Sequence, residues 1–226
     1  MTTIGYIPAR LGSERIRQKN LRPLAGEPLL TRALRTVQLA TALDQSYLNT
    51  ESDELAALAK PLGMPVHRRP ETLASNTTKT DEIVIEFLQH HPCDIVVLIN
   101  PTAPLLKPET IDSVVRRLQD SGAQAVFTTD PIKRHALFKG QPINFSTQAQ
   151  SPRTQDLEPV DVINFIVCAF DAQHALKTYH DKGHFLYTGT VLTHPMSAAE
   201  SLDIDEEHEF AYADFLLRRA SGPQQA

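Results

Sequence analysis

The amino-acid sequence predicts an α/β fold, a Rossmann-like three-layer α/β/α sandwich around a mostly parallel sheet. Short β-type runs recur along the 226 residues, and each is followed by a helical pattern. Strands that alternate with helices form βαβ units, whose sheet carries helices on both faces. One run, residues 94–99, is apolar almost throughout, as expected of a strand buried on both faces, and we place it in the middle of the sheet.

The first 130 residues contain most of this alternation. The predicted elements are strands over residues 3–7, 45–50, 95–100 and 125–129 and helices over residues 29–40, 53–62 and 108–121. From residue 131 to about 153 the pattern breaks down into polar and turn-forming residues, so we expect an excursion from the main sheet there. A strand over 162–170 and an amphipathic helix over 206–219 follow, and the tail 221–226 is expected to fray.

Composition excludes several classes of partner. The net charge of -5 leaves no basic footprint for DNA or RNA. No apolar run approaches the roughly 20 residues of a membrane helix, and no secretion signal is recognisable. With only two cysteines, Cys93 and Cys168, we expect a cytoplasmic protein with free thiols. The nine histidines lack a His-Glu-x-x-His spacing, so no metal is assigned to them.

The loop after the first strand, residues 7–20, has the chemistry of a triphosphate site. Gly12 permits close approach of the backbone, Ser13 offers a hydroxyl donor, and three side chains supply positive charge, those of Arg10, Arg15 and Lys19. The loop lies where open parallel sheets bind ligands, at the carboxyl ends of the strands. Neither the P-loop spacing nor G-x-G-x-x-G is present. Such a composition also fits a solvated surface loop, and that alternative stays open at this point.

Taken as a whole, this loop resembles the signature of the acylneuraminate cytidylyltransferase family and, more loosely, that of the CMP-Kdo synthetases. The resemblance rests on Pro8-Ala9-Arg10, Gly12-Ser13, Arg15-Ile16 and Lys19-Asn20. Kdo enzymes usually have Lys-Pro where this chain has Lys19-Asn20. The resemblance implies a fold of the nucleotidyltransferase type and a nucleotide site that includes Ala9, Arg10, Gly12, Ser13, Arg15, Lys19 and Asn20.

Two further segments are similar to the nucleotide side of the family. Residues 49–56 match its second strand and helix, with Glu51 in place of the usual Asp. Residues 69–78 match the Arg-Pro…Leu-Ala-Ser-Asp-Thr segment of the cytidine pocket, which implies nucleotide contacts from Ser75, Asn76 and Thr77. Those three side chains would alternatively only cap a helix that begins near residue 81.

Residues 100–105 match the turn Gln-Pro-Thr-Ser-Pro-Leu, which in the family faces nucleotide on one side and acceptor on the other. The resemblance therefore implies that Asn100 contacts both substrates and that Thr102 contacts the acceptor. The arginine that normally follows is Leu106 here. This change removes one positive charge near the site.

Residues 201–205 are similar to the Asp-Ile-Asp metal motif of the family. Asp203 and Asp205 stand at i and i+2 on an extended segment, so their carboxylates project to the same face and can chelate Mg²⁺. An Asp-x-Asp pair by itself is more often a solvated turn. Together with the N-terminal loop it predicts the magnesium site.

The acceptor half departs from the family. Residues 155–160 match Gln-Asp-Leu-Pro-Pro-Val, but residues 161–164 replace Tyr-Arg-Glu-Asn and an arginine directed across a dimer interface is missing. Phe165 stands where Gly is usual and Cys168 where Tyr is usual. We expect acceptor contacts from Arg153 and Asn164. Basic alternatives, which also fit a solvated surface, are Lys133, Arg134, His135 and Lys139. Cys168 lies in an apolar strand and is expected to be structural.

The sequence thus predicts one cytidylyltransferase domain, residues 1–226, with a dimerisation and acceptor-side subdomain within 131–190 and a homodimeric assembly. It would transfer CMP from CTP to an anionic acceptor, foremost a nonulosonic acid, with Arg10, Lys19, Asp203 and Asp205 as the catalytic groups. The alternatives are a Kdo-like sugar or a small phosphonate as acceptor, or a non-catalytic nucleotide-binding relative. The expected reaction is a direct displacement at the α-phosphorus of CTP.

Overall fold

A central sheet of seven strands organises the computed structural model, which describes residues 1–220; the tail predicted over 221–226 lies outside the described residues. The strand order is β11-β7-β10-β6-β1-β4-β5, and four of the six neighbouring pairs are parallel. The predicted mostly parallel α/β fold is therefore confirmed. The strands are β1 (Thr3–Pro8), β4 (Gln45–Thr50), β5 (Val66–Arg68), β6 (Ile95–Ile99), β7 (Ala125–Ile132), β10 (Val160–Asp171) and β11 (Val191–Pro195).

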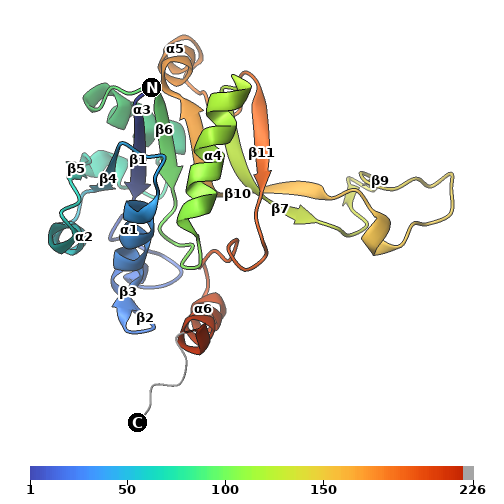
Figure 1. Cartoon of the computed structure of the whole chain (residues 1–226), viewed down its shortest axis with the longest axis horizontal. Helices are drawn as coiled ribbons and strands as arrows, with labels where there is room; N and C mark the ends of the chain where they lie inside the picture. Colours follow the sequence, from blue (N-terminus) through green and yellow to red (C-terminus); the bar gives the residue numbers. More distant parts are fainter. Residues whose placement is uncertain (221–226) are drawn as a thin grey trace.

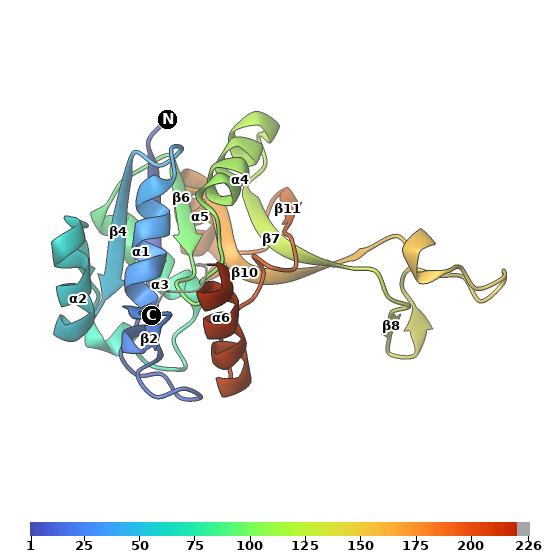
Figure 2. The same ribbon diagram turned by 60° about the horizontal axis from the view of Figure 1, so that its bottom comes forward.

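Strand β6 occupies the middle of the sheet, as its apolar run predicts. All five of its residues are buried. On one face of the sheet lie α1 (Leu29–Leu39), α2 (Asp53–Ala59) and α4 (Pro108–Ser121), and on the other lie α3 (Thr80–His90) and α5 (Ala172–Lys182) (Figures 1 and 2). These two layers bury separate apolar cores, which together with the sheet make the predicted three-layer sandwich.

Most predicted helices have the expected bounds. The predicted helix over 53–62 is divided into α2 and a 3-10 turn, Lys60–Leu62. Pro61 explains the division, because its ring clashes with the preceding turn of an α-helix and it has no N–H to donate. Helix α4 begins at Pro108 and ends before Gly122, whose φ of 66° is the left-handed conformation that favours glycine.

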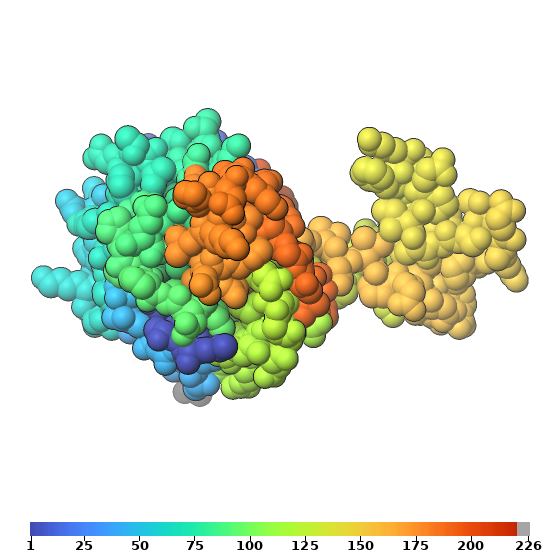
Figure 3. Space-filling view, turned by 90° about the horizontal axis from the view of Figure 1, so that it is seen from above, coloured from blue at the N-terminus to red at the C-terminus, as the bar shows by residue number. Residues whose placement is uncertain are grey.

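The predicted excursion is an arm, which we define as residues 130–162. It begins on the extension of β7 and returns on the start of β10, which pairs antiparallel with both β7 and β6. Near its tip lie a short hairpin of β8 (Leu137–Phe138) with β9 (Gln141–Pro142) and a 3-10 turn, Thr154–Asp156. The arm projects far from the sandwich in Figures 1 and 2, and Figure 3 shows it as a separate mass in yellow and light orange.

Strand β7 runs past the predicted end at residue 129 and includes Pro131. Strand β11 pairs with β7 only as far as Thr129, so beyond that point β7 has a neighbour on one side alone. A proline is tolerated in such a stretch, where the strand pairs with β10 alone and has no neighbour on its other side. The strand therefore continues three residues past its predicted end, into the start of the predicted excursion.

A third, smaller core lies under α6 (Glu207–Ala220), beside the short hairpin of β2 (Pro23–Leu24) and β3 (Glu27–Pro28). It joins the loop after β1 to the segment before α6 through the buried side chains of Ile16, Leu24, Leu29, Ile204, Phe210 and Ala213. In the part of the chain that the structure describes, no helix has the length and apolarity needed to span a bilayer.

Helix α4 is tied to the chain after α1 by Asp112, a buried carboxylate. It accepts hydrogen bonds from the backbone N–H groups of Thr41 and Ala42, both at 2.8 Å, and from the Thr41 hydroxyl at 2.6 Å. We predict that Asp112→Ala lowers the free energy of unfolding by about 2–3 kcal/mol, because it removes the charged acceptor of three hydrogen bonds. Urea unfolding followed by circular dichroism measures this.

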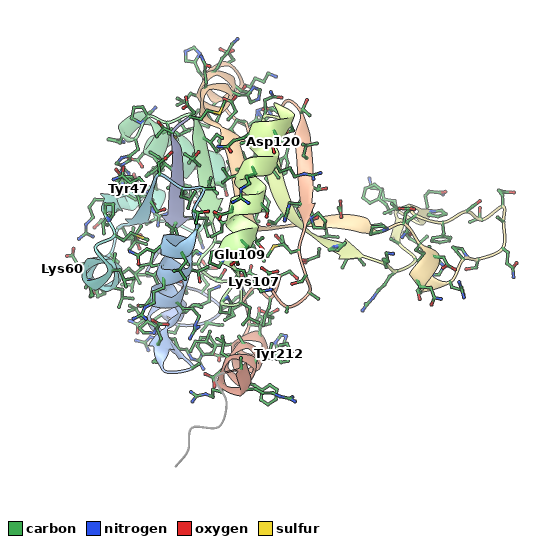
Figure 4. The ribbon with its side chains drawn as sticks, viewed as in Figure 1. Tyr47, Lys60, Lys107, Glu109, Asp120 and Tyr212 are labelled. Carbon is green, nitrogen blue, oxygen red and sulfur yellow. The ribbon has the colours of Figure 1, made fainter. Side chains whose placement is uncertain are left out.

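The matched control is Asp120→Ala, on the same helix. Asp120 is exposed and labelled near the end of α4 in Figure 4. Its replacement should change the free energy of unfolding by less than about 0.5 kcal/mol. Equal losses for both variants would contradict the role given to Asp112.

Candidate active site

A polar hollow of about 230 Å³ lies at the carboxyl ends of β1 and β6. The structure brings eight of the predicted site residues together around it. Its lining comprises Pro8, Arg10, Ser13, Glu14, Arg15, Ile16, Lys19, Asn20, Asn100, Pro101, Thr102 and Asp205. The N-terminal loop, the turn after β6 and the segment before α6 therefore meet at one place, and the loop lines a hollow there.

A second hollow of similar size adjoins the first and shares Pro8 and Arg10 with it. The remaining lining residues are Arg69, Ser75, Asn76, Thr78 and Ile83. Ser75 and Asn76 were expected here, whereas Thr78 takes the place predicted for Thr77. None of these side chains caps α3. Its N-terminal end is instead closed by Glu82, whose carboxylate accepts a hydrogen bond from the backbone N–H of Lys79 at 3.0 Å.

Arg10 stands at the junction of the two hollows. Among residues 1–220 its guanidinium has no hydrogen-bond or ion-pair partner, although five N–H donors are available. A cation that is half-buried and unpaired between two cavities is suited to a ligand anion.

The other basic side chains of the loop converge on Asp205. Arg15 pairs with its carboxylate at 2.6 Å, and the largely buried Lys19 ammonium lies 3.3 Å from the same oxygen. Lys19 also donates to the backbone carbonyl of Ile204. The loop and the acidic segment therefore fix each other, with positive charge next to the carboxylate.

Asp203 lies on the other side of Ile204. Because Ile204 is fully buried, the two flanking carboxylates project away from the third core, as the i, i+2 spacing predicts. The Thr102 hydroxyl donates to Asp203 and lies 2.8 Å from the Asn100 amide oxygen. Burial and the neighbouring Asp205 raise the pKa of Asp203, against the opposing effects of the Thr102 hydrogen bond and Lys19.

The backbone of the N-terminal loop is held by a buried ion pair between Glu51 and Arg69. From the sequence these two residues are only positions in matching motifs, and their contact is not predicted. Glu51 accepts from the Leu11 N–H at 2.8 Å and from Arg69 at 2.9 Å. Although burial alone would raise it, these hydrogen bonds hold the pKa of Glu51 below its ordinary value. Arg69 also reaches the Ala9 carbonyl at 3.4 Å. Glu51 thus connects the loop to the second hollow.

Three further predicted residues serve the loop in different ways. Asn20 donates to the Arg10 carbonyl at 3.1 Å, and its buried Oδ1 has no partner among residues 1–220, so it remains available to a ligand. Ala9 is buried and contributes backbone, with its N–H donating to the Asn49 carbonyl at 2.9 Å. A Cβ placed on Gly12 would meet no atom within 4 Å, so the chain itself leaves that approach open.

The two predicted acceptor residues on β10 and the arm do not line either hollow. Arg153 pairs with Asp156 at 2.7 Å on the arm. The Asn164 amide accepts from the Thr128 hydroxyl at 2.6 Å and donates to Asp130 at 3.0 Å. Within this single chain both side chains are engaged in local structure.

The cysteines take no part in the site. Cys168 is fully buried in β10, and burial raises the pKa of its thiol far above the ordinary value. Burial and Asp94 raise the pKa of Cys93 to about 12. Neither thiol ionises near neutral pH, in agreement with the structural role predicted for Cys168.

Comparison with known proteins places these residues in context. A family model described as cytidylyltransferase matches residues 4–166. The chain is 34% identical to 3-deoxy-manno-octulosonate cytidylyltransferase of Zea mays over 56% of this chain and 41% of the relative. It is 32% identical to N-acylneuraminate cytidylyltransferase B of Danio rerio over 66% of this chain and 37% of the relative. The chain spans about two-fifths of the length of the first curated relatives that it matches.

Other similar proteins match over nearly the whole length. CMP-N,N'-diacetyllegionaminic acid synthase of Legionella pneumophila is 28% identical over 96% of this chain and 97% of its own. A solved structure of CMP:2-keto-3-deoxy-manno-octonic acid synthetase complexed with CTP has a TM-score of 0.74 at 13% identity, over 97% of this chain and 100% of that one. The 4-diphosphocytidyl-2C-methyl-D-erythritol synthase of Anaerococcus prevotii has a TM-score of 0.71 at 14% identity, with 96% of each chain covered. These structural likenesses support the fold.

Replacing Asp203 and replacing Asp205 by asparagine should have opposite effects on the stability of the folded chain. A raised pKa in the folded state means that the fold binds the Asp203 proton more tightly than the unfolded chain does, so stability falls as pH rises from about 4 through the folded pKa. Asp203→Asn should therefore raise the urea midpoint at pH 7 and have less effect at pH 4.

Asp205→Asn is the matched counterpart. It removes the acceptor of Arg15 and Lys19 and should lower the free energy of unfolding at pH 7 by up to about 1 kcal/mol. Urea unfolding of both variants at the two pH values measures the effects. A loss of stability at pH 7 in Asp203→Asn would contradict the destabilising burial of that carboxylate.

Proposed function

Because this chain belongs to the cytidylyltransferase family, we propose that it transfers the CMP group of CTP to an anionic acceptor and releases pyrophosphate. The observation that carries the proposal is the unpaired guanidinium of Arg10 between the two adjoining hollows. A nucleoside triphosphate has a base at one end and several negative charges at the other, so it fits two such hollows with a free cation between them.

The proposed orientation follows from the charges. The triphosphate occupies the first hollow, where Arg15 and Lys19 lie, and the cytosine occupies the second, beside Ser75 and Asn76. Hydroxyl and amide groups can hydrogen-bond the edge of a base, and the limited volume disfavours a purine. Asn20 offers its unpaired buried oxygen to a donor on the nucleotide.

In the proposed reaction an oxygen of the acceptor attacks the α-phosphorus of CTP. A new P–O bond forms, the bond from the α-phosphorus to the bridging oxygen breaks, and pyrophosphate leaves with the electron pair. Arg10 and Lys19 offset the charge that develops on the phosphoryl oxygens. No covalent intermediate with the protein is required, in keeping with the un-ionised thiols of Cys93 and Cys168.

The donor set of Asp203 and Asp205 fits Mg²⁺, which binds proteins through one or two carboxylates and completes its coordination with substrate phosphates and water. Both carboxylates flank the buried Ile204, and Asp205 lines the triphosphate hollow. When bound, the cation supplies charge neutralisation for the phosphates. Arg15 and Lys19, which pair with Asp205 here, are then free to contact the nucleotide.

For the acceptor we propose a nonulosonic acid. The relative that matches over nearly the full length of both chains is named for a CMP-activated acid of this class. Relatives named for Kdo activation match between 54% and 66% of this chain, so a Kdo-like sugar is the alternative, followed by a small phosphonate. Leu106 is buried in the core between the sheet and the helices α1 and α4, and its side chain cannot pair with a carboxylate, so other residues must meet the charge of the acceptor.

We propose that the chain acts as a homodimer in which the arm, part of the acceptor-side subdomain 131–190, meets a second copy. The arm exposes large apolar side chains that its few strand contacts leave uncovered: Leu137, Phe138, Ile143 and Val162. Exposed apolar side chains gathered on one projection are typical of an interface. In a dimer, Arg153 and the other basic side chains of the arm would be candidates for the partner's acceptor site.

The first test of the proposed function measures pyrophosphate release from each of the four nucleoside triphosphates with Mg²⁺. The acceptors are sialic, legionaminic and pseudaminic acids, Kdo and aminoethylphosphonate. We expect release with CTP and one sugar acid. Binding of CTP without release for any acceptor would favour a non-catalytic nucleotide-binding protein.

Alanine variants of the N-terminal loop test whether the charges of Arg10 and Lys19 act in the reaction itself. We predict that Arg10→Ala and Lys19→Ala each lower kcat/KM for CTP by about 10²–10³, because each removes a cation from the phosphoryl group. Arg17→Ala, in the same loop but exposed and outside both hollows, serves as the control. Steady-state pyrophosphate release gives the values, and an equal loss in Arg17→Ala would contradict the assignment.

The arm yields a prediction about assembly. The double variant Leu137→Ser/Phe138→Ser should shift the protein from dimer to monomer in size-exclusion chromatography with light scattering, because it removes apolar surface from the interface. Leu39→Ser is the control, since Leu39 is equally exposed but lies on the sandwich at the end of α1. A monomeric parent protein, or a double variant that stays dimeric, would refute an interface at the tip.

A further inference from the structure

A group of metal-ligating side chains lies at the edge of the sheet, outside the site described above. His67 is on the edge strand β5, and Glu86 and His90 are on α3, one helical turn apart. One ligand atom from each of the three lies within 4.8 Å of the others. The His67 side chain is 7% exposed, that of Glu86 15% and that of His90 59%. The group is therefore anchored in the fold and open to solvent on one side.

The spacing of the ligand atoms suits a small cation. Nε2 of His67 lies 2.9 Å from one Glu86 carboxylate oxygen, and Nδ1 of His90 lies 3.3 Å from the other. Ligands about 2.0–2.1 Å from a tetrahedral Zn²⁺ are about 3.3 Å apart from one another. To bind the ion, Nδ1 of His90 must leave the Glu86 backbone carbonyl, which lies 2.9 Å away, and the exposed His90 side chain has room to rotate.

A further contact supports the ring that would bind the ion. Nδ1 of His67 lies 3.0 Å from Nε2 of His91. Metal-binding histidines characteristically donate their second N–H to an acceptor, and a neutral His91 offers a ring nitrogen for that role. In the tautomer that would bind an ion, Nε2 of His67 carries no proton and its single N–H, on Nδ1, donates to Nε2 of His91.

Aromatic packing orients these imidazoles. Phe87 meets the His67 ring edge to face at 5.3 Å and stacks on His91 at 4.6 Å. Tyr47, labelled at the left of Figure 4, covers His91 with its ring centroid 4.2 Å away. Rings held in this way lose little further freedom when they bind a ligand.

We propose that His67, Glu86 and His90 form a binding site for a divalent transition-metal ion of the zinc class, with a fourth position open to water. Two imidazole nitrogens and one carboxylate oxygen are a set that suits zinc, whereas Mg²⁺ prefers oxygen ligands alone. This site is independent of the proposed transferase reaction and distinct from the carboxylates of Asp203 and Asp205.

The position of the site gives the ion a structural effect. It would join the end of β5 to the last turns of α3, and residues 69–78, which form much of the second hollow, lie between these points in the chain. A ligand that cross-links the two ends stabilises the folded state in proportion to its binding. The ion should therefore raise the melting temperature and slow hydrogen exchange in residues 69–78.

The test uses the full-length protein without an affinity tag, treated with EDTA and then dialysed. ZnCl₂ is titrated by calorimetry in excess Mg²⁺, which occupies sites made only of oxygen. We expect one equivalent of zinc per chain, and Co²⁺ as a probe should give the intense visible absorption of a tetrahedral site. Glu86→Gln and His90→Ala should each weaken zinc binding by at least about 10–100-fold, since loss of a group that only hydrogen-bonds to a ligand already has an effect of that size.

The matched control is His180→Ala, a histidine that is 88% exposed on α5 and whose loss should leave zinc affinity unchanged. Circular dichroism of the metal-free variants verifies that they fold, and His90, which is largely exposed, is the safer substitution if Glu86→Gln does not. The proposal is overturned if the parent protein binds no zinc under these conditions. It is equally overturned if zinc binds the parent and His90→Ala with the same affinity.

Discussion

The geometry of the candidate active site depends on the burial of Ile204. Its side chain is enclosed in the third core beside Ile16, while its backbone N–H donates to the Thr102 carbonyl at 2.9 Å and its carbonyl accepts from Lys19. One residue therefore connects the N-terminal loop, the turn after β6 and the segment before α6. These three segments are far apart in sequence, and each alone is a loop whose position no regular hydrogen-bond ladder would fix. The two carboxylates beside Ile204 are placed by this apolar anchor.

A second constraint holds the other side of the N-terminal loop. The Glu51 carboxylate bridges the Leu11 N–H and Arg69, and both charged side chains are largely removed from water. A buried ion pair contributes little net stability compared with an apolar pair, but it fixes a particular geometry because either partner alone would be an uncompensated charge. The loop is thus held between an apolar anchor on one side and an ionic one on the other. Arg10 lies between these two anchors, and among residues 1–220 its guanidinium has no ion-pair partner. Such an unpaired cation suits an anionic ligand.

The parts of this fold that could be predicted are those whose sequence pattern has one physical meaning. The run over β6 is apolar on both faces, which only a central strand permits. The edge strand β5 has three residues, and β11 follows a loop without alternation, so neither carries a periodic signal. In the site, the sequence predicts the motif residues of one continuous loop together. Arg69 is different because it acts through Glu51, which follows the neighbouring strand β4 and is 18 residues away in sequence. The histidine and glutamate group was missed because His67 is 19 residues from Glu86 and only the fold joins them.

On the strand expected to face the acceptor, a phenylalanine at position 165 gives the backbone an unusual conformation and engages the neighbouring Asn164. Phe165 has a φ of 56°, a conformation that glycine adopts readily and a large side chain does not. The register between β10 and β7 shifts around it, between Ile163 and Cys168. The Asn164 amide oxygen accepts from the Ile166 N–H at 3.2 Å as well as from Thr128, so it holds this irregular backbone in place. An amide occupied in that way has little capacity left for an acceptor. The strain at Phe165 is therefore offset locally by Asn164, and the recognition of an acidic acceptor must rest on groups outside this bulge. Among residues 1–220, the arm side chains of Lys133 and Arg134 have no ion-pair partner, so in the proposed dimer they would be available to pair with an acidic acceptor.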